Sequence, residues 1–538
     1  MSGEVKEDAA GRERLGATRG RSLFRAAGLV SAFTLLSRIL GLARELAFAA
    51  LLGAGFHADA FQVAFRIPNL VRDLFAEGAL SAAFVPTYAR VLHREGRDAA
   101  HRLASLLFTI VGVLLALVVV LGILLAGPLV AALAPGFAEV PGKPELTVFL
   151  TRVMLPFLPL VSFAAIAMGM LNAEERYGPP AIAPALFNVV TILVGALLWA
   201  AGLPLELVVL GWSLGTLLGG VAQFLVQVPP LWRSGWRFRP AWSPRDPGLR
   251  AIGRLMAPAT VGLAAVQVNL FVSTIFASHQ PGAVSWLQFA FRLLYLPIGI
   301  FGVALGTVAT ATLARRASAG DREGMARTLL ESLRLLAFLT LPATVGLAVL
   351  GRPIVRLLYE RGRFTPSDTE ATAYAVALYS IGLVAYTGVK VLAPAFYVLG
   401  SPRVPLAASA LAVLTNVAVI LLLYDHLGYG AIALGTSLGS LLNALVLLVT
   451  FERRVGGLLG RALASGVARM AIAALVMAPA ARVAADALEG RFGTQGLAAQ
   501  LVTGLVPVLV GVAVYAAAAL ALRVPEAQRL TGALRRRS

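Results

Sequence analysis

The segment SRILGLARELAFAALLG, residues 37–53, places charged side chains inside an otherwise apolar run. Arg38, Arg44 and Glu45 have apolar sequence on both sides, as residues within a membrane-spanning helix would. An ionised side chain at the centre of a bilayer costs about 2.5 kcal/mol or more, so it must face water, a partner or a ligand. Because guanidinium groups bind phosphate oxygens through two parallel hydrogen bonds, these arginines are suited to holding an anion within the membrane.

A polar stripe follows in HADAFQVAFRIPNLVRDLFAEGALSAAFVP, residues 57–86. An α-helix turns by about 100° per residue, so residues seven apart share a face. The polar residues on or beside that face are Asp59, Arg66, Asn69, Arg72, Asp73 and Glu77. One interpretation is structural, with Arg66 paired to Asp59 or Asp73 so that helices are held together. The other is a polar seam that faces a ligand.

The balance of charge at this depth favours the interpretation in which the polar seam faces a ligand. The cations are Arg38, Arg44, Arg66, Arg72, Arg292 and Lys390, and the anions are Glu45, Asp59, Asp73 and Glu77. The cationic excess must face water or an anionic ligand, since an uncompensated buried cation is costly. We therefore expect a water-filled cationic cavity in which the ligand-facing residues are Arg38, Arg44, Arg72 and Arg292.

The elements that position these residues are membrane helices. The chain has 538 residues, of which 58% are hydrophobic and 14% charged, whereas soluble domains contain about 25% charged residues. A spanning helix needs about 20 apolar residues. This criterion predicts an all-α polytopic membrane protein with about fourteen helices, whose expected ranges are 24–52, 60–90, 103–126, 147–171, 181–201, 205–229, 251–278, 284–313, 326–350, 368–398, 404–424, 429–451, 464–485 and 498–522.

The net charge of +19 indicates membrane topology. Arginines gather in alternate loops, such as 90–102 and 233–250, while the intervening loops GAGFHA, AGLPLE, SHQPGA and YDHLGYG contain no Lys or Arg. This positive-inside pattern predicts cytoplasmic termini and gives no support to nucleic-acid binding. The basic segment within 351–366, GRPIVRLLYERGRF, is an exception because it falls on the predicted outer side. Either the helix count is wrong there or the segment is an interfacial helix, and we favour the interfacial helix.

The sequence contains little that would serve a metal site or catalysis. There is no cysteine, and no two of the five histidines have the spacing of metal ligands. The predicted outer loops offer few catalytic candidates, namely Glu145, Asp425 and His426. We therefore expect neither a metal centre nor an enzyme.

Two short motifs recur along the chain. The sequence QVAFR at 62–66 returns as QFAFR at 288–292, and Asn188 and Asn416 follow the related pairs 171–172 and 399–400 at similar distances. This spacing predicts two related six-helix lobes, as many transporters have. The expected organisation is a cytoplasmic tail 1–22, an N-terminal lobe 23–232, a C-terminal lobe 247–455, two additional helices 460–523 and a cytoplasmic tail 524–538.

The quoted residues resemble the MurJ (MviN) lipid II flippases of the multidrug/oligosaccharidyl-lipid/polysaccharide exporter superfamily. The likeness runs from about residue 23 to 455, and its most specific stretches are SRILGLARE, IPNLVRDLFAEGALSAAFVP, APGFAE, FASHQPGAVSWLQFAFRLLYLPIGIFGVALGT and VKVLAPAFY. The resemblance implies a fourteen-helix flippase of the bacterial inner membrane. Such a flippase moves undecaprenyl-diphosphate-linked peptidoglycan precursor to the outer leaflet for cell-wall biogenesis.

The resemblance also implies roles for individual residues. The family's essential arginines fall on Arg38, Arg44, Arg72 and Arg292, and its acidic positions fall on Asp59 and Glu77. Substrate binding is expected to include Asp59, Glu77, Asn69 and Lys390, and the supporting charge network Glu45, Arg66 and Asp73. The two additional helices would form a groove for the lipid tail. The implied partners are lipid II, membrane lipids and other cell-wall synthesis proteins.

The family also implies transport without a cofactor, coupled to the membrane potential or to a monovalent cation. Some relatives carry acidic residues beside the arginine that matches Arg292, where this chain has Phe291 and Tyr295. This departure leaves Arg292 less neutralised. Three alternatives remain: a flippase for another polyprenyl-linked glycan, a drug exporter of the same superfamily, and a membrane enzyme that acts on the same lipid. The net basic cavity is unsuited to cationic drugs.

Overall fold

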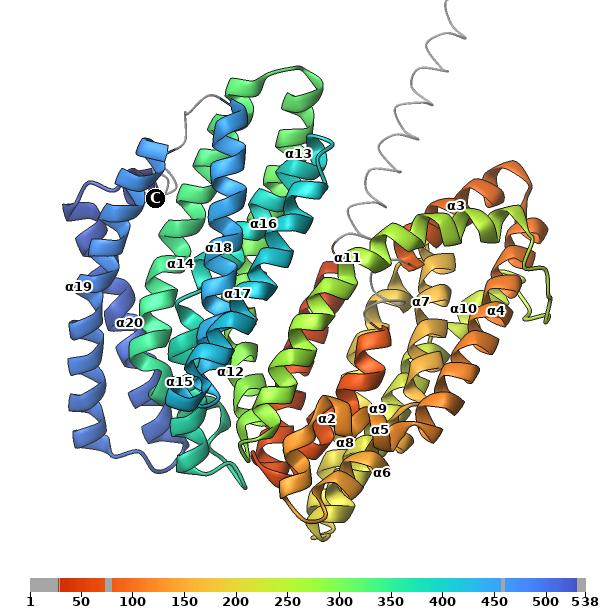
Figure 1. Ribbon diagram of the computed structural model, residues 1–538, viewed down its shortest axis with the longest axis horizontal. Coiled ribbons are helices and arrows are strands. Elements are labelled where there is room, and N and C mark those ends of the chain that lie inside the picture. The colour runs from red at the N-terminus through yellow and green to blue at the C-terminus, as the bar shows by residue number, and fades with distance from the viewer. Residues whose placement is uncertain (1–27, 29, 73–79, 456–459, 530–538) are drawn as a thin grey trace, which may run out of the picture. The chain divides into compact units, whose positions relative to one another are not determined.

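The computed structural model describes residue 28 and residues 30–72, 80–455 and 460–529. Within these residues every regular element is a helix, which confirms the all-α prediction (Figure 1). The first helix covers residues 30–52. The helices up to residue 233 are α2 Phe56–Arg72, α3 Leu80–Arg94, α4 Arg97–Leu124, α5 Ala126–Leu133, the 3-10 helix η2 Pro135–Glu139, α6 Lys143–Met154, α7 Phe157–Ala173, α8 Gly178–Ala200, α9 Leu205–Leu225 and α10 Val228–Arg233.

The second half of the chain contains longer helices. They are α11 Pro247–Ser278, α12 Ala283–Pro297, the π-helix η3 Ile298–Val303, α13 Ala304–Ser318, α14 Arg322–Tyr359, α15 Pro366–Ser380, α16 Leu383–Val398, α17 Arg403–Leu427, α18 Gly430–Val455, α19 Gly460–Phe492 and α20 Leu497–Ala521. Several predicted spans are interrupted, among them the span expected at 147–171, which is divided between α6 and α7. The span expected at 284–313 contains η3, and the span expected at 368–398 is bent by 45° between α15 and α16.

Among the described residues, ten helices are long and apolar enough to cross a membrane, or eleven if the bent pair of α15 and α16 counts as one span. The chain is therefore a multi-span membrane protein. The expected count of about fourteen stays a prediction, because the second expected span, 60–90, includes residues 73–79, which lie outside the described part of the chain.

Contacts divide the chain into two compact units. Unit 1 comprises the described residues up to Leu52, together with Ala60–Val130 and Gly142–Ala264, and unit 2 comprises Gly53–Asp59, Ala131–Pro141 and the described residues from Ala265 onward. Unit 1 is held by a core in which Phe84 and Tyr88 of α3, Phe108 of α4 and Met170 of α7 are buried. These aromatic and apolar side chains fix α3, α4 and α7 to one another.

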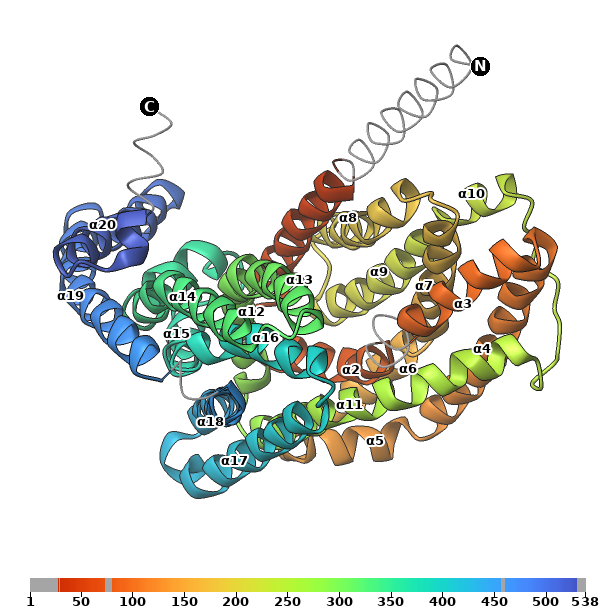
Figure 2. The ribbon, with the colours of Figure 1, turned by 90° about the horizontal axis from the view of Figure 1, so that it is seen from above.

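Unit 2 has one core between α13, α14, α16 and α18, and another that attaches α19 and α20 to α14. In the second core Tyr515 of α20 is buried, and its hydroxyl donates to the carbonyl of Phe338 at 2.8 Å. Arg334 of α14 contacts Glu526 at 2.9 Å. The last two long helices therefore lie side by side against α14 (Figure 2).

The recurring asparagines hold equivalent positions in the two units. In unit 1, Asn188 on α8 donates to the carbonyl of Ser37 in the first helix at 3.2 Å. In unit 2, Asn416 on α17 donates to Oδ1 of Asn269 on α11 at 2.6 Å. Each asparagine thus joins a late helix of its unit to an early one, which supports the internal repeat.

The basic segment 351–364 is the end of α14 and the loop after it, so it is not a separate interfacial helix. Two of its four arginines have acidic partners: exposed Arg352 pairs with Glu370, whereas buried Arg356 lies 2.7 Å from Glu489 of α19 and 3.7 Å from Glu360. The prediction of an interfacial helix was wrong because it weighed the arginines without these distant carboxylates.

Replacing Arg356 by alanine is expected to lower the free energy of unfolding by about 2 kcal/mol, because Glu489 and Glu360 lose their partner. Glu489 is partly exposed, so water offsets part of the loss. The matched control is Arg352→Ala, whose exposed pair should cost less than about 1 kcal/mol. Thermal unfolding of both purified variants in detergent measures the difference, and equal losses would contradict the assignment of Arg356.

The segment Ala131–Pro141 packs against the end of α11 within unit 2. The amide of Gly136 donates to Oγ of Ser278 at 3.0 Å, and a Cβ at residue 136 would lie 2.5 Å from the backbone of His279. Only glycine permits this approach. Gly136→Ala should therefore lower the free energy of unfolding by about 2 kcal/mol.

The control for this change is Gly490→Ala on α19, where an added Cβ meets nothing within 4 Å. It should be neutral or slightly stabilising, since alanine favours a helix more than glycine does. Both variants can be compared by thermal unfolding in detergent. A Gly136→Ala protein as stable as Gly490→Ala would show that the backbone contact is not tight.

Candidate functional site

The first helix carries Arg38 and Arg44, which have different surroundings. The guanidinium of Arg44 donates to Oε1 of the buried Glu45 at 2.8 Å and lies 5.2 Å from the ring centroid of Phe187 on α8. Arg38 is exposed within its unit. Arg44 is thus held in a fixed orientation by a carboxylate and an aromatic face, whereas Arg38 is accessible to a ligand.

Helix α2 carries the predicted polar seam as far as residue 72. Arg66, Asn69 and Arg72 are half-buried, and Pro68 lies inside the helix. Oδ1 of Asn69 is buried and has no hydrogen-bond partner among the described residues. A buried acceptor without a donor is uncommon and requires an explanation. The other two seam residues, Asp73 and Glu77, lie outside the described residues.

Asp59, at the start of α2, is fully buried and caps α12. One carboxylate oxygen accepts from the amide of Gly282 at 2.8 Å, and the other accepts from the amide and the hydroxyl of Ser285 at 3.0 and 2.7 Å. These amides belong to the first turn of α12, where backbone donors have no partner inside the helix. A negative charge there is also favoured by the helix dipole. Asp59 therefore orients the helix that carries Arg292.

Sequence analysis missed this cap. The signal for it lies at the start of α12, where the residue before the helix is Gly282 and its side chain offers no acceptor. A helix that begins without Ser, Thr, Asp or Asn needs an acceptor from elsewhere. The sequence does not say which carboxylate supplies it.

Helix α12 presents Arg292 on a polar face that sequence analysis did not identify as a unit. Gln288, Arg292 and Tyr295 fall on one side of the helix, with Arg292 half-buried and Tyr295 about half exposed. The π-helix η3 follows directly, and π-helical turns often occur at functional sites. The repeated motif places Gln62 and Arg66 at the equivalent positions of α2.

Two neighbours of Arg292 on α12, Phe291 and Tyr295, belong to an aromatic cluster. The ring of Phe291 contacts those of Tyr295 and Tyr379 at 5.1 Å and that of Tyr386 at 5.8 Å. These rings come from α12, α15 and α16. These neighbours of Arg292 are thus aromatic and not acidic.

Lys390 lies on α16 in unit 2 and is exposed. Its helix is fixed by a close approach to α13, where a Cβ at Gly306 would lie 2.6 Å from the carbonyl oxygen of Lys390. The candidate residues are distributed over both units. Unit 1 holds Arg38, Arg44, Glu45, Arg66, Asn69 and Arg72, and unit 2 holds Asp59, Arg292 and Lys390. Among the described residues, no three His, Asp or Glu side chains are grouped so that they would hold a metal ion.

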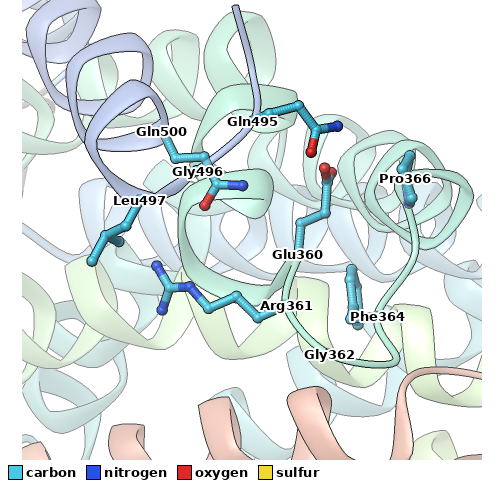
Figure 3. A pocket seen from close by; sticks show the side chains of 9 residues that line it. All are labelled: Glu360, Arg361, Gly362, Phe364, Pro366, Gln495, Gly496, Leu497 and Gln500. Carbon is cyan, nitrogen blue, oxygen red and sulfur yellow. The ribbon is translucent and has the colours of Figure 1, made fainter.

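A pocket of about 630 Å³ opens elsewhere in unit 2, between the loop after α14 and the start of α20 (Figure 3). Its polar side chains are Glu360, Arg361, Gln495 and Gln500. Glu360 accepts a hydrogen bond from Thr369 at 2.6 Å. None of the predicted site residues lines this pocket, so it is separate from the predicted cationic site.

Comparison with known proteins identifies the family. The family model for the lipid II flippase MurJ matches residues 48–503. A probable lipid II flippase MurJ of Vibrio cholerae serotype O1 is 36% identical over 473 residues, which cover 86% of this chain and 89% of the relative. The family model therefore begins near the end of the first helix and extends into α20.

Two solved structures share the fold. A lipid II flippase MurJ in an inward closed conformation matches with a TM-score of 0.75, 23% identity and coverage of 92% of this chain and 99% of that chain. An inward-facing multidrug resistance MATE family transporter of the MOP superfamily matches with a TM-score of 0.66 and 16% identity, over 80% of this chain and 98% of that chain. The helical membrane fold, the extent of the sequence match and the placement of the cationic residues lead to one conclusion: the chain belongs to the lipid II flippase MurJ family.

Proposed function

We propose that this protein moves lipid II, the undecaprenyl-diphosphate-linked peptidoglycan precursor, from the cytoplasmic to the outer leaflet of the bacterial inner membrane. The observation that carries the proposal is the presence of cationic side chains on apolar helices in both units. Arg38 and Lys390 are exposed within their units, and Arg292 lies on a polar face of α12. Cations at that depth are retained where an anion or water meets them.

In this mechanism the diphosphate is bound by Arg38, Arg44, Arg72 and Arg292, because guanidinium groups pair with phosphate oxygens in a bidentate manner. Asn69 and Lys390 contact the remaining headgroup, and the polyprenyl tail stays in lipid. Glu45 and Arg66 orient the arginines, with Asp73 and Glu77 predicted to balance their charge. Asp59 supports the site by holding the first turn of α12.

Transport would proceed by alternating access, in which the two six-helix lobes expose the site first to one side and then to the other. Both termini are proposed to be cytoplasmic, with fourteen helices in all. The empty carrier returns with a net positive site, and moving one charge across the membrane is worth about 2.3 kcal/mol per 100 mV. The membrane potential is therefore the proposed source of coupling, with a monovalent cation as the alternative.

Complementation tests the proposal. Cells depleted of their own lipid II flippase are supplied with this protein, and outer-leaflet lipid II is followed by its cleavage with an added lipid II-degrading toxin. Restored cleavage is expected. A protein that is present in the membrane but restores nothing would indicate another polyprenyl-linked glycan as the substrate, which transport assays with that glycan would then identify.

A further inference from the structure

The connection between α9 and α11 is a structured strap, which we define as residues 228–246. It comprises α10 and an extended stretch that ends where α11 begins at Pro247. The extended stretch of the strap, and not α10, lies against α4 (Figures 1 and 2). Both elements belong to unit 1.

Three contacts fix the strap to unit 1. Trp236 is buried, its indole donates to Oγ of Ser105 on α4 at 3.3 Å, and its ring lies 5.2 Å from that of Phe108. The amide of Ala241 donates to Oγ1 of Thr109 at 3.3 Å. At the other end, Arg176 donates to the carbonyl of Pro230 at 2.9 Å. The strap therefore holds a defined conformation.

The outer side of the strap combines exposed aromatic rings with exposed arginines. Trp232, Phe238 and Trp242 are 52%, 49% and 64% exposed. The exposed arginines beside them are Arg233, Arg237, Arg239 and Arg245. We name these seven residues the aromatic–arginine face.

Negative charge does not neutralise this face. The sequence of the strap contains one acidic residue, Asp246, and its Oδ1 accepts from the amides of Gly248 and Leu249 at the start of α11. Arg237 donates to the carbonyl of Trp232 at 2.8 Å and lies 5.7 Å from that ring. This contact holds an indole and a guanidinium next to each other on the exposed side.

The strap lies at the end of two membrane helices. The candidate span Leu205–Arg233 ends within it, and its contacts on α4, at Ser105 and Thr109, are in the N-terminal half of the candidate span Arg97–Leu124. Indole and phenyl rings concentrate at the boundary between headgroups and acyl chains, where one part of the ring is apolar and the other wet. Arginines at the same level meet lipid phosphates.

We propose that the aromatic–arginine face binds the headgroups of anionic phospholipids in the leaflet next to it. The rings enter the boundary region of that leaflet, and the arginines pair with phosphate oxygens. Insertion of the rings into the leaflet removes their exposed apolar area from water. Binding to an acidic protein surface would leave that apolar area in water. The proposal does not depend on the identity of the transported substrate.

Quenching of tryptophan fluorescence tests the proposal. The full-length protein is placed in nanodiscs that contain increasing mole fractions of phosphatidylglycerol or phosphatidylcholine brominated near the headgroup end of the acyl chains. The contribution of Trp232 and Trp242 is the difference between the native protein and the W232F/W242F variant. We expect brominated phosphatidylglycerol to reach half-maximal quenching at a mole fraction at least about fivefold lower than phosphatidylcholine does.

Charge removal separates electrostatic from purely apolar contact. The triple variant R233Q/R239Q/R245Q should lose the preference for phosphatidylglycerol and retain native thermal stability, because these three side chains are exposed and the anchoring Arg237 is kept. The matched control R315Q/R322Q/R453Q removes three exposed arginines in unit 2 and should keep the preference. Equal quenching by both lipids in the native protein would overturn the proposal, and so would the absence of quenching, which would place the face in water.

Discussion

Replacing Arg292 with alanine is expected to lower lipid II translocation by about 10- to 150-fold. The range corresponds to the loss of one hydrogen-bonded contact with a charged group, worth about 1.5–3 kcal/mol. Arg292 lies on the polar face of α12, where aromatic rings occupy the neighbouring positions. No neighbouring cation on that face replaces it, since Gln288 and Tyr295 are neutral. The measurement is outer-leaflet lipid II accessible to a cleaving toxin in flippase-depleted cells.

Two further variants make this result specific. Arg292→Lys keeps the charge but not the bidentate geometry, and it should recover only part of the activity. Arg315→Ala removes an exposed arginine at the end of α13 and should be fully active. Native activity of an Arg292→Ala protein that is correctly inserted would mean that Arg292 serves helix packing and not substrate binding.

Replacing Asp59 with alanine is expected to lower the free energy of unfolding of the protein by about 3–9 kcal/mol. The change leaves three buried donors of Gly282 and Ser285 without an acceptor, and each orphaned donor costs about 1–3 kcal/mol. Asp59→Asn keeps one carbonyl acceptor and should lose less. The measurement is thermal unfolding in detergent followed by the fluorescence of Trp286, which lies in the first turn of α12.

A double-mutant cycle with Ser285→Ala tests the contact itself. If Asp59 and Ser285 act together, the losses in unfolding free energy of the two single variants should add up to more than the loss of the double variant. The reason is that the serine hydroxyl is already orphaned in Asp59→Ala. Asp425→Ala, which removes an exposed carboxylate on α17, is the matched control and should have little effect. Additive losses for Asp59 and Ser285 would show that Asp59 acts elsewhere.

The helices were predictable from sequence because long apolar runs are a strong signal. Their interruptions were not. The runs 284–313 and 368–398 read as continuous, yet the first contains η3 and the second bends after Ser380. Close approaches to neighbouring helices accompany these breaks, such as that of Gly302 in η3 to Thr387 of α16. The hydrophobic pattern of one helix does not indicate where a neighbouring helix approaches it closely.

The candidate residues were only partly predictable for the same reason. Periodicity placed Asp59 on a stripe with Arg66, but its hydrogen-bond partner Gly282 is 223 residues away in sequence. Likewise, the arginines of 351–364 fall on the predicted outer side, and the partner of Arg356 is Glu489, 133 residues later in the sequence. Composition indicates that charge must be compensated at such depth, whereas the fold decides which residue compensates it.

The segments Gly53–Asp59 and Ala131–Pro141 belong to unit 2 although the chain on either side of each belongs to unit 1. Their partners, Gly282 and Ser278, are translated 223 and 142 residues after Asp59 and Gly136. At a synthesis rate of about 5–20 residues per second, Asp59 is translated about 10–45 s before the start of the helix that it caps. Unit 2 is therefore complete only once its two early segments have met the residues from Ala265 onward.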